Sequence, residues 1–245
     1  MTYCVGLLMK DGFVLAADTR TNAGLDNIAT FKKLHSWSQP GKRVFALATS
    51  GNLATTQGVV SLLTEGTQSL RKRGAADNLF TAKTMFQAAQ IVGRSVRDVQ
   101  RGDEGQLFQS EDTFSANFLF AGQIGEERPR LFQIYSAGNF IEATADTSFL
   151  QIGEHKYGKP ILDRVSDPDM RLGEAAKLVL LSFDSTIRSN LSVGMPIDLL
   201  VYQRDTLKLE RVRRIERDNP YFQKLSSEWG KALRRAFADI EEFDI

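Results

Sequence analysis

Residues 2–18 read TYCVGLLMKDGFVLAAD, two apolar runs joined by a short polar link. The link contains Asp11-Gly12, and Asp-Gly between two apolar runs is a strong sequence signal for a β-hairpin. We therefore predict paired strands over residues 3–9 and 13–17, with Asp18 at the end of the second strand. This hairpin is the first element of the predicted fold.

Thr2 comes directly before the first of these strands, one cleavage away from a free N-terminus. A free α-amine has a pKa of about 7.7–8.0, so it can act as a general base near neutral pH. A threonine hydroxyl beside its own amine is a complete pair of nucleophile and base on one residue. Because Met1 blocks that amine, catalysis by Thr2 requires the removal of Met1, which we expect for a small second residue. Its position alone does not distinguish a catalytic Thr2 from an ordinary residue that happens to follow the first methionine.

The composition of the chain excludes several classes of protein. Its 245 residues are 42% hydrophobic and 25% charged, as in ordinary globular proteins. A net charge of +1 gives no reason to expect a nucleic-acid or membrane partner. No apolar run approaches the roughly 18 residues that a membrane span needs, and no secretory-signal pattern is present. The single cysteine, Cys4, cannot form an intrachain disulfide, so we expect a cytoplasmic protein.

The chain has only two histidines, His35 and His155. A metal site built from His and Cys would need nearly all three of these side chains, Cys4 included, to converge. A Ser-His-Asp triad would have to use one of the two histidines. We therefore expect no metal and no cofactor. Catalysis by an N-terminal amine needs no histidine, so their scarcity favours it.

The rest of the chain alternates groups of strands with pairs of helices. The apolar run at residues 43–49 is typical of a strand buried on both faces. Apolar residues at helical spacing predict amphipathic helices over residues 172–183 and 217–241. The other predictions are helices over residues 54–72, 79–100 and 157–165, strands over 113–121, 130–135, 140–144, 148–152, 196–203 and 206–213, a loop over 101–112, and a loop or irregular strand over 19–30.

This order of elements predicts one domain of the α+β class over residues 1–245. The chain contains no linker rich in Pro, Gly or Ser, and no repeat. Two strand groups and two helix pairs predict a four-layer αββα sandwich, with two sheets face to face and helices outside. We expect residues 217–245 to form a C-terminal helical extension that packs on the body or on a neighbouring subunit.

Several residues at the ends of predicted elements have the chemistry that a site at the N-terminus needs. Asp18 ends a strand, and the ends of neighbouring strands lie about 4.8 Å apart. Lys33, held near an acid, can stay charged and relay protons. Gly51 lies between a strand and a helix, where a free backbone N–H can bind an oxyanion. Asp184 and Ser192 offer a carboxylate and a hydroxyl. Taken singly, each residue also has an ordinary explanation as a strand-end acid, a surface lysine, a turn glycine or a helix end.

Five segments, taken in order, carry a more specific signal. They are TYCVG at 2–6, DTRTNAG at 18–24, NIATFKK at 27–33, QIGEHKYGKP at 151–160 and SFDST at 182–186. The set resembles the β-subunits of proteasomes, which are N-terminal-nucleophile hydrolases, and most closely their bacterial Anbu (ancestral β-subunit) branch. The resemblance spans residues 2 to about 204.

The resemblance implies the sandwich fold of proteasome subunits and the activity of a threonine peptidase on a peptide or protein substrate. It also implies a homo-oligomer, either a ring or an open helical assembly, and it identifies no unfoldase partner. Thr2 matches the nucleophile that is exposed once Met1 is removed. Asp18 and Lys33 match the acid and the lysine that tune it, and Gly51 matches the oxyanion-hole residue.

Other family positions are matched less completely. Asp184 and Ser192 match the pair that holds the terminal amine, although this chain has extra residues between them. Ile152 stands where proteasome β-subunits have a serine that supports the amine, and isoleucine cannot donate a hydrogen bond. Three further residues match positions of the substrate pocket: Thr21, Thr49 and Ser50.

Three alternatives remain open at this point. One is an N-terminal-nucleophile acylase that cuts a non-peptidic amide, and another is an assembly or binding scaffold that has kept only the fold. Ile152 favours the scaffold, whereas the presence of Thr2, Asp18 and Lys33 favours an enzyme. Cys4 as the nucleophile would require cleavage after Tyr3.

Overall fold

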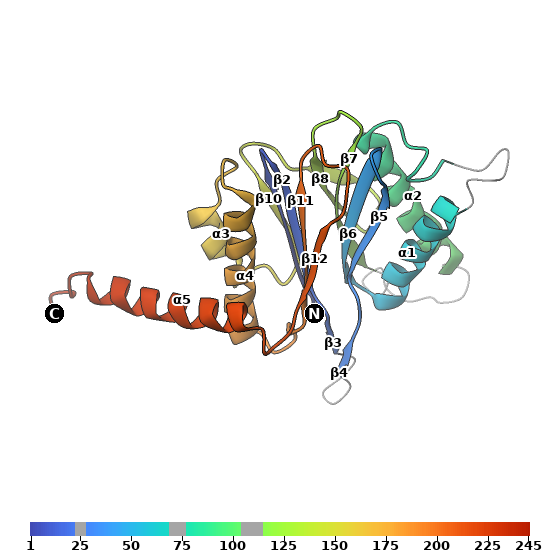
Figure 1. The fold of residues 1–245 in the computed structure, drawn as a ribbon. Helices are drawn as coiled ribbons and strands as arrows, with labels where there is room; N and C mark the ends of the chain where they lie inside the picture. Colours follow the sequence, from blue (N-terminus) through green and yellow to red (C-terminus); the bar gives the residue numbers. More distant parts are fainter. Residues whose placement is uncertain (23–27, 69–76, 104–114) are drawn as a thin grey trace.

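The computed structural model describes residues 1–22, 28–68, 77–103 and 115–245. Two five-stranded antiparallel sheets lie face to face, with helices on both outer faces (Figure 1). The predicted αββα sandwich is therefore confirmed. Because each sheet buries one face on the other and one face under helices, most strands are apolar on both sides.

The N-terminal sheet has the strand order β10-β1-β2-β11-β12. The predicted hairpin is present, and Cys4 pairs with Ala17 across it. Asp18 is the last residue of β2 and therefore lies beside the beginning of β1. The bounds are β1 Tyr3–Met9, β2 Gly12–Asp18, β10 Phe149–Gly153, β11 Ile197–Gln203 and β12 Arg211–Ile215.

The second sheet has the order β5-β6-β7-β8-β9, and β3 and β4 form a separate two-stranded ribbon. Strand β6 of the second sheet is buried over all but its first and last residues, as the apolar run at 43–49 predicts. The bounds are β3 Arg20–Asn22, β4 Ile28–Thr30, β5 Leu34–Gln39, β6 Arg43–Gly51, β7 Ala116–Ile124, β8 Arg130–Ile134 and β9 Phe140–Glu142. The predicted strand over 113–121 and the predicted loop over 101–112 fall partly outside the described residues.

Helices α1 and α2 cover the second sheet, and α3 and α4 cover the N-terminal sheet (Figure 1). The bounds are α1 Leu53–Gln68, α2 Met85–Asp103, α3 Lys159–Val165, α4 Leu172–Ser189 and α5 Pro220–Ala238. The helix predicted over 79–100 begins later, because Asn78 and Thr81 form a turn in which the Asn78 N–H donates to the Thr81 hydroxyl at 2.9 Å. Residues 69–72 of the helix predicted over 54–72 lie outside the described residues.

The strand predicted over residues 206–213 is also displaced. Asp205 and Leu207 have φ values of 64° and 47°, which no regular strand adopts. The Gln123 side chain holds this turn, since its carbonyl oxygen accepts from the Asp205 N–H at 2.9 Å. Strand β12 therefore begins only at Arg211.

The layer between the sheets is a continuous apolar core that includes Cys4, Leu15, Ala17 and Ile152. Each fully buried side chain of leucine size contributes about 1.5–3 kcal/mol of transfer free energy. Cys4 on β1 and Ala17 on β2 belong to this core, so Thr2, just before β1, stands at its edge.

Helix α5 begins beside α4 and then extends away from the body (Figure 1). Phe222 is buried at its start, and the Arg188 guanidinium on α4 donates to the Ser226 hydroxyl at 2.6 Å. Further along, Leu233 and Phe237 are 50% and 81% exposed. The helix is thus attached to the body by its first turns, whereas its later turns present apolar side chains at the surface.

Candidate active site

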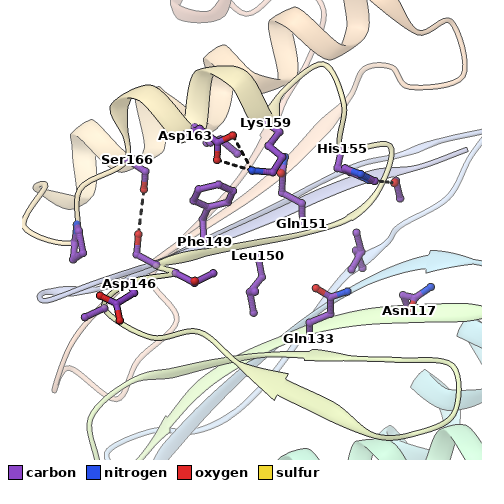
Figure 2. Close-up of a pocket in the computed structure, with 17 residues that line it drawn as sticks. Asn117, Gln133, Asp146, Phe149, Leu150, Gln151, His155, Lys159, Asp163 and Ser166 are labelled. Atoms are coloured by element: carbon purple, nitrogen blue, oxygen red, sulfur yellow. Dashed lines mark hydrogen bonds and ion pairs between the residues drawn. The ribbon is translucent and has the colours of Figure 1, made fainter.

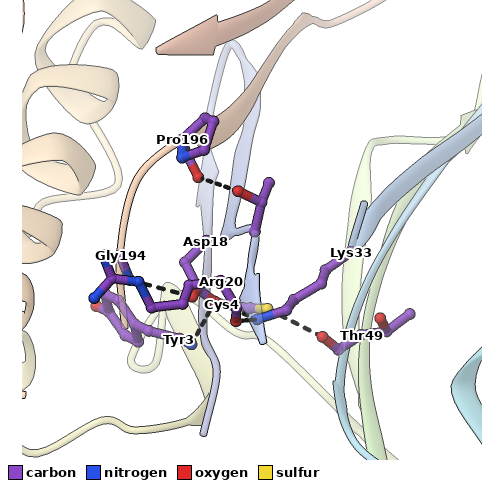
Figure 3. A network of polar contacts seen from close by, with 9 residues as sticks. Tyr3, Cys4, Asp18, Arg20, Lys33, Thr49, Gly194 and Pro196 are labelled. Carbon is purple, nitrogen blue, oxygen red and sulfur yellow. Dashed lines mark hydrogen bonds and ion pairs between the residues drawn. The ribbon is translucent and has the colours of Figure 1, made fainter. Parts of the chain in front are cut away.

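Asp18 connects three segments around the start of β1 (Figure 3). One carboxylate oxygen accepts from the Tyr3 N–H at 3.1 Å and from the Lys33 ammonium at 2.9 Å. The other oxygen accepts from the Gly194 N–H at 3.4 Å. The carboxylate is completely buried. Asp18 therefore ties the first strand, the lysine and the segment before β11 together.

Lys33 lies just before β5, and its side chain is buried as well. Its backbone position is fixed because its carbonyl accepts from the Thr49 N–H of β6 at 3.0 Å. Besides Asp18, the ammonium donates to the Arg20 carbonyl. A buried ammonium needs such partners, because burying a charge without them is very costly. The structure thus brings together Lys33 and Asp18, which the resemblance matches to the lysine and the acid of the family.

Two opposing effects act on the pKa of the Asp18 carboxyl. Burial raises it above its ordinary value, because desolvation disfavours the charged form. The Lys33 ammonium and the N–H groups of Tyr3 and Gly194 act in the opposite direction. The partner of opposite charge for the Asp18 carboxylate is the Lys33 ammonium.

Gly51 ends β6 immediately before α1. Its φ of +104° lies in a region that favours glycine, and a Cβ here would overlap the Ser115 carbonyl oxygen. The next residue, Asn52, caps α1, because its side chain accepts from the Thr55 N–H at 3.0 Å. Gly51 is therefore fixed at the point where a strand turns into a helix, as the sequence suggests.

A cavity of about 270 Å³ joins these groups. The predicted residues Thr2, Lys33 and Gly51 all line it, and so do the three predicted pocket residues. Thr2 is only 8% exposed, whereas Met1 is 66% exposed and lines the same cavity. The complete lining consists of Met1, Thr2, Thr21, Lys33, Thr49, Ser50, Gly51, Leu53 and Thr56. Removal of Met1 would thus leave the Thr2 amine and hydroxyl at this cavity.

Asp184 and Ser192 lie in the neighbouring elements, and neither lines this cavity. The Asp184 carboxylate on α4 pairs with Arg188 at 3.1 Å. Ser192 lies in the segment between α4 and β11, and its N–H donates to the Asn190 side chain at 2.9 Å. That segment reaches the site at Gly194, through the hydrogen bond to Asp18.

Ile152 lies deeper than the site. It pairs with Cys4 across β10 and β1 and is 3% exposed in the core between the sheets. On this side Gly153 pairs with Tyr3, and the next residue, Glu154, lies beside Thr2, because its N–H donates to the Thr2 carbonyl at 2.7 Å. Sequence reasoning missed Glu154, because an acid after a predicted strand is ordinary until the pairing of β10 with β1 is known.

Cys4 is buried, and its thiol points to the Thr49 carbonyl at 3.5 Å. Burial raises the pKa of this thiol, so the thiolate that a cysteine nucleophile needs is disfavoured. Cys4 is therefore a residue of the core, not a reactive group.

A larger cavity, of about 620 Å³, lies along β10 and α3 (Figure 2). Phe149, Gln151, His155 and the ion pair of Lys159 with Asp163 border it. None of the predicted site residues lines it. We assign the candidate site to the smaller cavity, because it is the one lined by Thr2 and Gly51, the predicted nucleophile and the predicted oxyanion donor.

Among the described residues, no helix is both long and apolar enough to span a membrane. Within the same residues, no group of three or more His, Cys, Asp or Glu side chains is arranged to hold a metal ion.

Comparison with known proteins agrees with this geometry. The model of the family described as "Proteasome subunit" matches residues 2–201. The structure of Anbu from Hyphomicrobium sp. strain MC1 is 60% identical, with a TM-score of 0.92 over 100% of both chains. Anbu from Yersinia bercovieri is 45% identical, with a TM-score of 0.93 over 100% of this chain and 99% of that one. The Anbu complex from Pseudomonas aeruginosa, described as a helical assembly, is 46% identical, with a TM-score of 0.91 over 99% and 98% of the two chains. The chain therefore belongs to the proteasome subunit family, in its bacterial Anbu branch.

Proposed function

We propose that this chain, once Met1 is removed, is a threonine peptidase subunit that hydrolyses amide bonds with Thr2 as its nucleophile. The observation that carries the proposal is the convergence of Thr2, Lys33 and Gly51 on one cavity, with Asp18 paired to Lys33. A nucleophile, an amine base on the same residue and an oxyanion donor are the parts that acyl transfer requires.

The proposed reaction proceeds through an ester of Thr2. The Thr2 hydroxyl oxygen attacks the substrate carbonyl carbon while its proton passes to the Thr2 amine. The Gly51 N–H stabilises the negative charge that develops on the carbonyl oxygen. The amine then gives the proton to the leaving nitrogen as the carbon–nitrogen bond breaks. Water, activated by the same amine, hydrolyses the ester and restores the free hydroxyl.

Lys33 and Asp18 act on this sequence through charge. An ammonium beside the Thr2 hydroxyl stabilises the alkoxide character of the oxygen during attack. Asp18 holds the Lys33 ammonium in position through their 2.9 Å contact. Because both side chains are buried, water screens this effect less than it would at the surface.

The three residues Thr21, Thr49 and Ser50 are proposed to bind the substrate beside the scissile bond. The Thr21 hydroxyl is buried and has no hydrogen-bond partner among the described residues. Such a group is costly to leave unpaired, so a polar group of a bound substrate would satisfy it. The backbone of a peptide carries a donor and an acceptor at nearly every residue and suits this position.

We further propose that the subunit works in a homo-oligomer. Relatives of this family include a helical assembly. The exposed apolar residues Leu233, Phe237 and Ile240 on and just after α5 supply a surface that a second copy would bury. Replacing Leu233 and Phe237 with Glu is expected to reduce the native mass to that of a smaller particle, whereas an unchanged native mass would exclude α5 from the assembly.

A panel of substrates tests the proposed activity. Met1-free protein is incubated with a library of blocked peptides and with acylated small amines, and Thr2→Ala protein is the control. Cleavage of peptides that is lost in Thr2→Ala supports the peptidase. Cleavage confined to acylated amines would favour the acylase, and no cleavage of either class by a correctly assembled, Met1-free protein would favour the scaffold.

A further inference from the structure

Two buried carboxylates flank the beginning of β1, one on each neighbouring strand. Asp18 ends β2 on one side, and Glu154 follows β10 on the other. Both residues are buried, with 0% and 7% of their surface exposed. Asp18 is paired with Lys33, but none of the ion pairs formed by described residues includes Glu154. The two carboxylates are thus alike in position and different in their partners.

The Thr2 backbone is turned toward Glu154. Tyr3 pairs with Gly153, so the next pair in the register is Thr2 with Glu154. In an antiparallel pair, the N–H and C=O of one residue point to the same neighbouring strand, and those of the next residue point to the other. The Tyr3 N–H donates to Asp18 on the β2 side, and the Thr2 carbonyl accepts from Glu154 on the β10 side. The Thr2 nitrogen therefore faces β10 and Glu154.

The neighbouring backbone leaves little room for Glu154 to move. Gly153 has a φ of +80°, and a Cβ there would overlap the Thr2 carbonyl oxygen. The backbone of residues 153 and 154 therefore packs directly on Thr2. This close approach fixes the point from which the Glu154 side chain extends.

The Glu154 carboxylate has neutral hydrogen-bond donors on two sides. One oxygen accepts from the Lys156 N–H at 3.1 Å, and the other accepts from the Asn190 side-chain amide at 2.9 Å. A carboxylate has about four acceptor sites, so further sites remain. Asn190 in turn accepts from the Ser192 N–H, which ties Glu154 to the segment that also contacts Asp18. A buried carboxylate with only neutral donors is costly, and a cation beside it would offset that cost.

We propose that Glu154 is the positioning residue that holds the α-amine of Thr2 after Met1 has been removed. The inference rests on the proposed function, because it assigns the support of the amine that acts as base. Removal of Met1 creates a positive charge on the Thr2 nitrogen, on the side of β1 that faces Glu154. The carboxylate then accepts a hydrogen bond from that amine, in the place for which the sequence offered only Ile152.

This role has a definite electrostatic consequence. The negative charge favours the protonated amine, so it stabilises the proton that the amine takes from the Thr2 hydroxyl. The same charge keeps the amine protonated up to a higher pH, and a protonated amine cannot act as base. Glu154 therefore makes the amine a stronger base and shifts its working range to higher pH.

Other charged groups lie on the elements around the start of β1. They are Asp18 at the end of β2, Lys33 before β5, Arg20 on β3, Asp184 with Arg188 on α4, and His155 and Lys156 next to Glu154. Asp18 forms an ion pair with Lys33, and Asp184 forms one with Arg188. Arg20 donates to the Leu191 carbonyl at 2.8 Å. All these groups stay unchanged in a Glu154 variant, so a comparison at fixed ionic strength isolates the Glu154 charge.

The test measures the pH dependence of the reaction of Thr2 with a peptide epoxyketone in Met1-free, assembled protein. Glu154→Gln is compared with Glu126→Gln, which removes one charge at an exposed turn, and with Glu154→Asp, which keeps the charge. In Glu154→Gln, the plateau rate is expected to fall, because the amine is less well held. The fraction of that plateau retained at pH 6.5 is expected to rise about tenfold, as one ordinary charge interaction would produce. Glu126→Gln is expected to match the wild type, and Glu154→Asp to recover part of the wild-type profile.

A second measurement does not depend on activity. The Thr2 Cβ resonance of protein labelled with ¹³C-threonine reports the protonation of the amine, and its titration midpoint is expected at lower pH in Glu154→Gln. If the wild type does not react but the midpoint moves, the proposed function fails and the role of Glu154 stands. If the wild type reacts, and folded Glu154→Gln has the same rate profile and the same midpoint, the role of Glu154 is overturned.

Discussion

The Lys33 ammonium lies 2.9 Å from the Asp18 carboxylate, and both groups are buried. The pair joins β2 to the segment before β5, so it links the two sheets beside Thr2. In the proposed function it also tunes the nucleophile. Removal of one partner leaves the other charge buried without its counterion, whereas removal of both leaves no unpaired charge. Single and double variants therefore separate the contribution of the pair to stability from its contribution to reactivity.

Lys33→Ala is expected to abolish the reaction of Thr2 and to lower the free energy of unfolding by about 3–5 kcal/mol, because Asp18 is left buried and unpaired. The double variant Asp18→Asn/Lys33→Met removes both charges and keeps the volumes similar. It is expected to recover most of the stability but none of the reactivity. Denaturant unfolding and the rate of adduct formation measure the two effects, and a double variant that reacts at the wild-type rate would contradict the assigned role.

Gly51→Ala is expected to impair both folding and reactivity, because its Cβ would overlap the Ser115 carbonyl and displace the proposed oxyanion donor. The matched control is Gly41→Ala, since Gly41 also has a positive φ, of +73°, but has open space around it. The control is expected to lose about 1–2 kcal/mol of stability and no reactivity. Gly51→Ala is expected to lose more stability and about a hundredfold in the rate of adduct formation. Equal effects of the two substitutions would show that the backbone at 51 has no special part.

Ile152→Ser tests whether a serine at this position would support the amine. Because Ile152 is buried against Cys4 and below the site, we expect a loss of about 2–5 kcal/mol in stability and no gain in reaction rate. Ile141→Ser on β9 is the control, since that isoleucine is 46% exposed. A faster reaction of the Ile152→Ser protein would instead place residue 152 at the amine.

His35 is expected to make the fold sensitive to acid. Burial lowers the pKa of His35 to about 4, from an ordinary value of 6.5. Above pH 6.5 the histidine is neutral in both folded and unfolded chains and has no effect. As the pH falls below 6.5, the unfolded chain binds a proton that the folded chain refuses, so stability is lost down to about pH 4. His35→Gln is expected to remove about 2 kcal/mol of the loss between pH 7 and pH 5. Chemical denaturation at both pH values measures it, and an equal loss in the two proteins would contradict the shift.

The hairpin of β1 and β2 and the buried strand β6 could be predicted from the sequence, because their signals are local. Asp-Gly at a turn and an unbroken apolar run need no knowledge of the rest of the chain. The beginning of the strand predicted over 206–213 could not be predicted, because the Gln123 side chain from another strand holds the turn at Asp205. Side-chain contacts between distant segments leave no local pattern.

The same limit applies to the site. Thr2, Asp18, Lys33 and Gly51 stand at strand ends and turns where the sequence marks a change of structure. Glu154 has no such mark, since its position depends on the antiparallel pairing of β10 with β1, residues that are far apart in the chain. The sequence contains the acid, but only the register shows that it lies opposite Thr2.

The intact mass of inhibitor-treated protein shows whether the free N-terminal Thr2 is the nucleophile. A peptide epoxyketone reacts with both the hydroxyl and the free amine of an N-terminal threonine. Met1-free protein is expected to gain the mass of one inhibitor per chain, with the modification on Thr2. A variant with a lysine inserted between Met1 and Thr2, which keeps its methionine, is expected to gain none. A Met1-free protein that stays unmodified, or an inserted variant that is modified equally, would show that the free Thr2 is not the nucleophile.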